Sequence, residues 1–203
     1  YLFMTMKILA ASDLHGDLSA ARKLSEKAKK EKVDIVILSG DILVKDSPQG
    51  VIGEFKKNNQ KVLLIPGNHD SFATTDFIAE FYGVRNLHGY YVKYEDVGFF
   101  GCGGADIGLS KVTEKETFEI LKKSFDKVKN LKKKVMVTHM HPAGSKAEFS
   151  GFEGNRGITK AVREFKPDLL LCGHIHEASG IEEKVGKTKI INLGPEGKII
   201  EIW

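Results

Sequence analysis

Short apolar runs rich in Val, Ile and Leu recur along the chain, and each gives way abruptly to glycine, proline or polar residues. Runs of this length and composition are typical of buried strands. They occupy residues 7–11, 34–38, 61–65, 134–138 and 168–172. Apolar residues recur with a helical period at residues 18–31, 74–82, 113–131 and 158–165, and a short helix is expected within 47–58. This alternation predicts an α/β fold built from βα repeats.

Two parts of the chain depart from this alternation. Residues 90–95 and 97–102 predict two strands joined by a tight turn. Strands expected near the carboxyl terminus cover residues 181–185, 187–193 and 198–203. These last three strands predict an antiparallel meander that closes a sheet edge. Residues 143–157 form a loop rich in Gly and Ser, and a long loop over a strand end is often functional.

Polar side chains that can bind metal follow the first two strands. Asp13 and His15 come directly after the first strand, and residues two apart on an extended backbone point the same way. Both can therefore bind one ion. Asp41 follows Gly40 at the end of the next strand, and the glycine permits a tight turn that lets the carboxylate reach across the sheet edge. Asp41 is therefore the candidate bridging ligand.

Three further strand ends carry side chains of the same kinds. They supply Asn68, His69 and Asp70, then His139, and finally His174 and His176. A single polar triplet after a strand is usually turn chemistry, and a lone histidine is usually a satisfied structural residue. Here, however, most of the seven histidines gather at strand ends. This clustering indicates a metal site.

The donor types narrow the choice of metal. Carboxylate, imidazole and amide donors without thiolate suit Mn, Fe, Zn, Co or Ni better than a structural zinc finger or an all-oxygen calcium site. The donors divide naturally into two sets that share Asp41, so two divalent ions are expected, with manganese favoured. The glycines at 101–104 could also cradle a phosphate, but they lack a full phosphate-binding motif, and a plain turn is the stronger interpretation.

Composition sets the remaining limits. The chain has 203 residues, of which 41% are hydrophobic and 29% charged, which fits one domain over residues 1–203. The net charge of +4 is too small to indicate nucleic-acid binding. Cys102 and Cys172 end apolar runs and are interpreted as buried thiols, which favours a cytoplasmic protein. No apolar run is long enough to span a membrane, and residues 1–6 are interpreted as an alternative start or a disordered leader.

The order of these motifs resembles the calcineurin-like metallophosphoesterase superfamily, whose pattern is D-x-H, G-D, G-N-H-D/E, H and G-H-x-H. The match runs from Asp13 to His176. It implies a four-layer α-β-β-α sandwich, with two facing mixed β-sheets flanked by helices. It also implies that one metal is held by Asp13, His15, Asp41 and His176, and the other by Asp41, Asn68, His139 and His174.

The same resemblance implies roles for two further residues. His69 would be the acid beside the phosphate, and Asp70 its supporting partner. The fourth motif departs from the common H-x-P-P, because this chain has His139-Met140-His141-Pro142. Either histidine could therefore be the ligand. His139 is favoured because it is nearer the strand end, and His141 is interpreted as a substrate-side or structural residue.

The expected reaction is hydrolysis of a small phosphate ester by a hydroxide that bridges the two ions. No cap is visible between the motifs, and Lys146 and Arg156 are the obvious cations among their loops. Phosphodiesters are therefore expected to be preferred over monoesters. The alternatives are a scaffold that keeps the fold without catalysis, and a DNA-repair nuclease of the same superfamily. Neither a nucleic-acid nor a membrane partner is expected, and a homodimer is one option for the assembly.

Overall fold

The computed structural model describes residues 5–43 and 50–202, and the strands in these ranges form two mixed sheets. The first sheet has the order β11-β1-β2-β3-β4, in which β11 is antiparallel to β1 and the other neighbours are parallel. Its strands are β1 (Met6–Ala11), β2 (Ile35–Ser39), β3 (Val62–Ile65), β4 (Arg85–Asn86) and β11 (Lys198–Ile202).

The second sheet has the order β5-β6-β7-β8-β10-β9, with β5 and β9 antiparallel at its two edges and parallel pairing between. Its strands are β5 (Tyr91–Tyr94), β6 (Val97–Cys102), β7 (Lys133–Thr138), β8 (Leu169–Cys172), β9 (Glu182–Val185) and β10 (Thr188–Asn192). The predicted pair at 90–95 and 97–102 is confirmed as the antiparallel β5 and β6.

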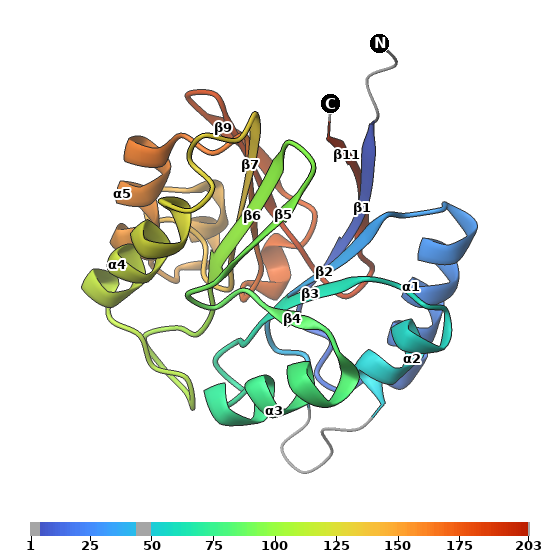
Figure 1. Ribbon diagram of the computed structural model, residues 1–203. Helices are drawn as coiled ribbons and strands as arrows, with labels where there is room; N and C mark the ends of the chain where they lie inside the picture. Colours follow the sequence, from blue (N-terminus) through green and yellow to red (C-terminus); the bar gives the residue numbers. More distant parts are fainter. Residues whose placement is uncertain (1–4, 44–49, 203) are drawn as a thin grey trace.

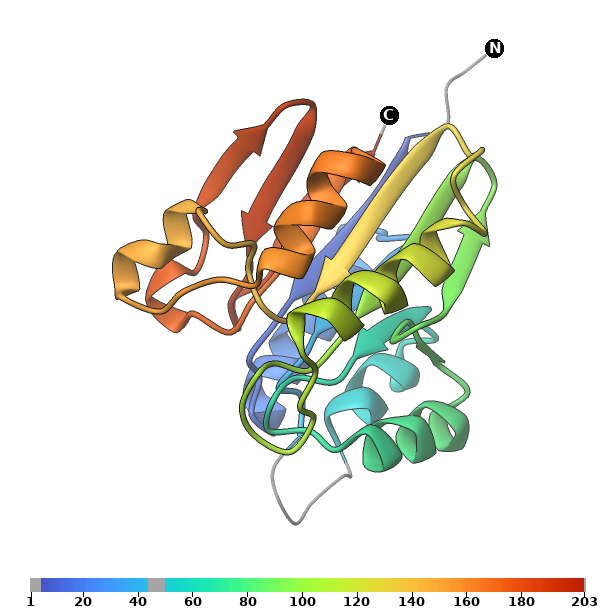
Figure 2. The ribbon, with the colours of Figure 1, turned by 90° about the vertical axis from the view of Figure 1, so that its left-hand side faces the viewer.

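Helices cover the outer face of each sheet. The first sheet packs against α1 (Leu18–Lys30), α2 (Val51–Lys57) and α3 (Phe72–Tyr82), and the second against α4 (Glu114–Phe125) and α5 (Arg156–Phe165). In Figure 1, α4 and α5 lie on one side and α1 and α2 on the other, with both sheets between them. Figure 2 shows α4 and α5 in front of the second sheet. The expected four-layer α-β-β-α sandwich is confirmed.

Alternation along the strands explains the layers. Ile8 and Ala10 face the second sheet, whereas Leu9 faces the helices of the first. In the same way, Phe99 packs between the two sheets, whereas Phe100 packs under α4 and α5. Both faces of each central strand are thus buried, which is why these strands read as continuous apolar runs.

Buried serine hydroxyl groups link two strand ends of the first sheet to each other and to a strand end of the second sheet. Ser39 Oγ, at the end of β2, donates to the Thr138 carbonyl at the end of β7 over 3.0 Å. Ser12 Oγ, just after β1, donates to the Ser39 carbonyl over 3.1 Å. These bonds fix the seam on which the functional residues lie.

Three sequence-based expectations are corrected. The strands near the carboxyl terminus do not form one meander, because β10 pairs with β8 and β9 while β11 crosses to the first sheet and pairs with β1. The helix expected at 113–131 ends at Phe125 and continues as turns. The loop 143–157 contains a short 3-10 helix, η1 (Lys146–Ser150), and α5 begins inside its predicted end.

Two other expectations fall partly outside the described residues. The segment 47–58, in which a short helix is expected, begins outside the described residues, and its described part contains α2. Residues 1–4 of the leader are likewise outside, and β1 begins at Met6. Among the helices that the structure describes, none has the length and apolarity that a membrane crossing requires.

Candidate metal centre

The predicted ligands lie on five loops, each at the carboxyl end of a strand. The first sheet supplies three loops, which follow β1, β2 and β3, and the second supplies two, which follow β7 and β8. The residues on these loops are Asp13 and His15, Asp41, Asn68, His139, and His174 with His176. Contacts between side chains from different loops bring all seven together at the seam between the sheets.

Four of these residues have a left-handed backbone. The φ angles are 58° at Asp13, 43° at His15, 50° at Asp41 and 72° at His174. Such angles cost residues with a Cβ atom about 1 kcal/mol or more each, and they cluster at functional sites. Hydrogen bonds between loops maintain them: the Asp13 amide donates to the Gly40 carbonyl over 3.0 Å, and the His15 amide to the Asp41 carbonyl over 2.8 Å.

Asp13, His15 and His176 form one group of potential ligands. One ligand atom of each lies within 4.8 Å of the others. The Nε2 atoms of His15 and His176 are 3.3 Å apart, and His176 Nε2 is 3.5 Å from Asp13 Oδ1. The Asp41 carboxylate borders this group, because its Oδ2 lies 3.9 Å from His15 Nε2.

Asp41, His139 and His174 form a second group within the same limit. His139 Nε2 lies 3.5 Å from Asp41 Oδ2 and 3.0 Å from Asn68 Oδ1, so Asn68 adjoins this group. Asp41 Oδ2 therefore faces both groups. Gly67 makes the approach of the loops possible, since a Cβ atom there would lie 2.0 Å from Asp41 Oδ1.

The spacing of these atoms fits divalent ions. Nitrogen and oxygen ligands bind zinc-like ions at about 2.0–2.2 Å, so neighbouring ligands of a six-coordinate ion are about 3 Å apart and opposite ligands about 4 Å. The contacts between candidate ligands run from 3.0 Å to 3.9 Å. Asp13 Oδ1 is also buried without a hydrogen-bond partner among the described residues. A cation would compensate the desolvation of that oxygen.

Electrostatics favours the ligand forms of Asp41 and His174. Burial raises the pKa of Asp41, but His139 and the amide of His69 lower it more, to about 2. Burial lowers the pKa of His174 to about 4, helped by the neighbouring His139. Burial opposes protonation of His139, yet Asp41 outweighs it and raises the pKa of that imidazole. An anionic carboxylate and a neutral His174 are therefore present at neutral pH.

His69 lies at the edge of the site with its side chain largely exposed. Its amide donates to Asp41 Oδ1 over 2.8 Å, and its Nε2 lies 4.0 Å from Asp41 Oδ2. The His69 ring also meets the ring of His15 edge to face at 5.3 Å. Asp41 thus holds the backbone of His69 and leaves the His69 imidazole accessible.

The expectation that Asp70 supports the His69 ring is corrected. The Asp70 carboxylate is buried and accepts hydrogen bonds from the backbone amides of Ile42, Leu43 and Gly67, at 3.2 Å, 3.0 Å and 2.8 Å. Although Asp70 follows His69 directly in the chain, its side chain points into the loop core rather than toward the imidazole. Burial raises the pKa of Asp70 and the three amides oppose that rise. Asp70 therefore joins the loops after β2 and β3.

His139 and His141 occupy different positions. His139 lies in the second ligand group, whereas His141 belongs to neither group. The His141 side chain is buried, and neither ring nitrogen has a hydrogen-bond partner among the described residues. The structure thus favours His139 as the ligand candidate, in agreement with its position nearer the strand end.

A hollow of about 290 Å³ opens beside the two groups. Its lining residues are Asp41, Asn68, His69, Ile107, Phe152, His174, Ile175, His176 and Glu177. Sequence reasoning missed Ile107, Phe152, Ile175 and Glu177. The available signal for Ile107 and Phe152 was the presence of large apolar residues in two segments that are otherwise rich in small and polar residues.

The other sequence candidates around the site lie elsewhere or are already bonded. The amide of Gly103 donates to His88 Nδ1 and that of Gly104 to the Pro66 carbonyl, so these glycines form a turn and do not present their amides to a phosphate. Arg156 and Lys146 are not among the residues that line the hollow.

Comparison with known proteins agrees with the site. A family model described as calcineurin-like phosphoesterase matches residues 6–178. An uncharacterized protein of Methanocaldococcus jannaschii is 29% identical over 205 residues, which cover 96% of this chain and 91% of that protein. This relative has similar length but no described activity.

Solved structures share the fold at low sequence identity. A Thermus thermophilus protein superimposes with a TM-score of 0.79 at 17% identity and covers 98% of both chains. A structure described as a novel archaeal phosphodiesterase gives a TM-score of 0.56 at 20% identity, over 97% of this chain and 100% of that one. Because the family model spans most of the sequence, including every motif at the strand ends, the chain belongs to the calcineurin-like phosphoesterase family.

Proposed function

We propose that this protein is a metal-dependent phosphoesterase that prefers phosphodiesters. The observation that carries the proposal is the pair of ligand groups around Asp41, whose atoms have the spacing of donors to two ions. Asp13, His15, Asp41 and His176 would hold one ion, and Asp41, Asn68, His139 and His174 the other. Two bound ions would lower the pKa of a water and neutralise the phosphoryl oxygens.

His69 supplies the proton for the leaving group in this proposal. Its imidazole lines the hollow, and the bond from its amide to Asp41 holds it beside the ions. General acid catalysis of this kind is typically worth about 10² to 10⁴ in rate. The contribution is largest for an alkoxide leaving group, since a good leaving group departs without protonation.

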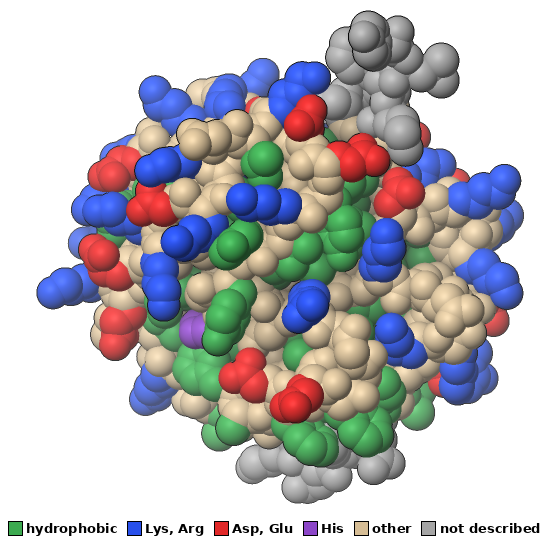
Figure 3. Space-filling model, in the orientation of Figure 1, with side chains coloured by type: hydrophobic (Ala, Val, Ile, Leu, Met, Phe, Trp, Pro, Cys, Tyr) green, Lys and Arg blue, Asp and Glu red, His purple; other side chains and the backbone are tan. Residues whose placement is uncertain are grey.

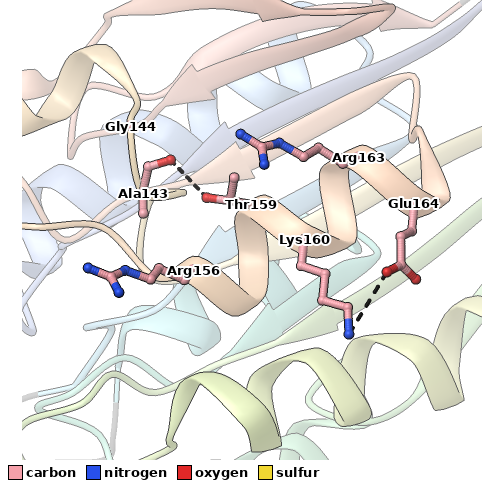
Figure 4. A pocket seen from close by; sticks show the side chains of 7 residues that line it. All are labelled: Ala143, Gly144, Arg156, Thr159, Lys160, Arg163 and Glu164. Carbon is pink, nitrogen blue, oxygen red and sulfur yellow. Dashed lines mark hydrogen bonds and ion pairs between the residues drawn. The ribbon is translucent and has the colours of Figure 1, made fainter.

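The charge around the hollow supports a diester over a monoester. A monoester carries about one more negative charge and benefits from Arg or Lys beside the phosphate. The described lining residues include no Arg or Lys, and Glu177 adds a carboxylate. Arg156 instead lines a separate hollow of about 450 Å³ with Lys160 and Arg163, as Figure 4 shows, and its guanidinium pairs with Glu153 at 2.7 Å.

One face of the described part of the molecule offers no cluster of cations for a nucleic acid (Figure 3). On the face in Figure 3, Lys and Arg side chains alternate with Asp and Glu and do not gather in one basic stripe. A duplex-binding surface needs clustered cations along its contact with the phosphates. The completeness of both ligand groups argues against a scaffold without catalysis, and the neighbour described as a phosphodiesterase is in accord with the proposed reaction.

A metal-add-back assay tests the proposal. The protein is stripped with chelator and then supplied separately with Mn, Fe, Zn, Co or Ni, and kcat/KM is measured for bis(p-nitrophenyl) phosphate and p-nitrophenyl phosphate. Hydrolysis is expected to return with at least one metal and to be faster for the diester. The absence of hydrolysis with every metal overturns the proposed activity, and a preference for the monoester overturns the diester assignment.

The role of His69 is tested on the same system. His69→Ala is expected to lose about 10²-fold or more in kcat on a diester with an alkoxide leaving group. The loss should be much smaller on bis(p-nitrophenyl) phosphate, because p-nitrophenolate needs little protonation. Equal losses on the two substrates would contradict a role as leaving-group acid.

A further inference from the structure

Two large apolar side chains stand exposed at the mouth of the candidate site. Ile107 is 53% exposed and Phe152 is 63% exposed, and both line the hollow beside the ligand groups. Ile107 comes from the loop between β6 and α4, and Phe152 from the loop between η1 and α5. Large apolar side chains left exposed on loops at a binding site are a recurrent mark of ligand contact.

The loop that carries Ile107 is fixed to the ligand loop. The Leu109 amide donates to the Asn68 carbonyl over 2.7 Å. Gly108 has φ 82°, and a Cβ atom there would lie 2.2 Å from the Asn68 oxygen, so the chain can approach this closely only with glycine. The position of Ile107 is therefore tied to that of a candidate ligand.

The loop that carries Phe152 is also held in place. Glu148 Oε1 accepts from the amides of Gly144 at 2.8 Å and Gly154 at 2.9 Å, which bridges the loop across its base. The two amides lower the pKa of Glu148. Both apolar side chains are thus presented on braced loops, and less entropy is lost when a ligand packs against them.

The neighbouring charges indicate what kind of group packs there. The hollow is lined both by imidazoles and by the apolar side chains of Ile107, Phe152 and Ile175, and Glu177 disfavours additional negative charge. A planar aromatic group can pack flat on Phe152 and against Ile107 while its phosphate reaches the ligand groups.

Resting on the proposed function, we propose that Ile107 and Phe152 bind an aromatic substituent of the substrate. The substrate class is then a monoanionic phosphodiester with at least one planar aromatic group, such as an aryl ester or a nucleoside ester. Ile107 and Phe152 determine specificity for that group and take no part in the bond cleavage.

Binding of stable diester mimics tests this assignment without hydrolysis. Diphenylphosphinate and dimethylphosphinate carry the same single charge, and their organic groups are joined to phosphorus by carbon–phosphorus bonds instead of ester bonds, so neither is hydrolysed. Their Kd values are measured by calorimetry on the Mn²⁺-supplemented protein. Diphenylphosphinate is expected to bind about tenfold more tightly, which corresponds to about 1.4 kcal/mol, because its phenyl rings pack against Phe152 and Ile107.

The chain offers a matched control for each residue. Phe149 is 64% exposed in η1, three residues before Phe152, and Leu109 is 61% exposed in the same loop as Ile107, but neither lines the hollow. Phe152→Ala and Ile107→Ala are expected to weaken diphenylphosphinate several-fold and leave dimethylphosphinate unchanged. Phe149→Ala and Leu109→Ala should change neither Kd.

Each outcome bears on the assignment. Equal binding of the two phosphinates, no binding of either, or equal effects of Phe152→Ala and Phe149→Ala overturns it. If the aromatic preference holds while no diester is hydrolysed with any metal, the proposed activity fails and the aromatic subsite stands. If a diester is hydrolysed but the aromatic preference is absent, the proposed activity stands and the aromatic subsite fails.

Discussion

Asp13, His15, Asp41 and His174 adopt positive φ angles, a conformation that glycine accepts far more readily than any residue with a Cβ atom. Hydrogen bonds between neighbouring loops hold the backbone here, so the candidate ligands are oriented by the fold itself. The strain is a cost that the rest of the fold must offset. Replacing one of these residues with glycine should therefore relieve backbone strain even as it removes a candidate metal ligand.

Substitution at His15 separates these two effects. His15→Gly is expected to have a free energy of unfolding about 1 kcal/mol higher than His15→Ala, because both lose the imidazole and only glycine relieves the strain. Urea unfolding in chelator measures the difference. His176, which has no positive φ, serves as the control, and there the glycine variant should be the less stable of the two. The same order at both positions would contradict the strain argument.

The position of Asp41 between the two groups leads to a second prediction. Asp41→Asn is expected to weaken both ions, since the carboxylate faces both groups, whereas His15→Ala should mainly weaken one. Elemental analysis of dialysed protein gives the number of ions retained. Two ions in Asp41→Asn would contradict the bridging role.

The lowered pKa of His174 predicts how the metal-free protein responds to pH. The pKa is about 4 in the fold, against an ordinary value of 6.5, so between these values the unfolded chain takes up a proton that the folded chain does not. The free energy of unfolding in chelator should therefore fall as the pH is lowered from 6.5 toward 4. The raised pKa of His139 has the opposite effect. Above the ordinary pKa of a histidine, the folded chain keeps a proton that the unfolded chain has lost, so this group lowers the free energy of unfolding as the pH rises.

Denaturant titrations at several pH values check this dependence. His174→Gln lacks the titrating group and should show a shallower fall over the same interval. An equally steep fall in the variant would assign the effect to other groups.

Among the structural elements, the sequence best predicts the strands and the loops that follow them. Each apolar run predicts a strand, and Asp13, Asp41 and His139 are placed at strand ends because polar residues follow those runs directly. The partner of each strand is not predictable from its own residues. The sequence places β11 at the wrong edge because β11 follows β10 closely in the chain but pairs with β1, near the other end of the chain.

Other features depend on contacts that no local pattern records. The positive φ angles come from hydrogen bonds between loops, and the bonds of Asp70 come from amides on a different strand end. Phe152 resembles an ordinary loop residue in the sequence, since nothing in its neighbourhood shows that its loop closes over the site. The sequence thus shows which residue types are candidate ligands, but it does not show the contacts between loops that hold them in place.

Asp70 links the loops after β2 and β3, and its replacement should report on that link. Asp70→Asn puts an amide donor among the three backbone donors and is expected to lower the free energy of unfolding by about 2 kcal/mol, as for lost hydrogen bonds to a charged group. Denaturant unfolding in chelator measures this loss. Asp106, an exposed acidic residue, provides the control, and Asp106→Asn should change stability little.

The three apolar layers account for the stability of the molecule independently of the site. One lies between the sheets and two lie between a sheet and its helices, and the ligand loops border the sheets at a single edge. Chelation is therefore expected to abolish hydrolysis while the chain stays folded. Thermal unfolding followed by circular dichroism, with and without chelator, checks this prediction. Global unfolding in chelator at room temperature would contradict it.

Each proposed ion takes donors from both halves of the chain. Asp13, His15, Asp41 and Asn68 precede β5, whereas His139, His174 and His176 follow it. Neither half carries a whole site, so recombination between relatives at the β4–β5 connection would join two half-sites of different ancestry. Such a chimera keeps a full set of donors only where both parents carry matching residues at each strand end. The division of the ligands thus ties the inheritance of one half to that of the other.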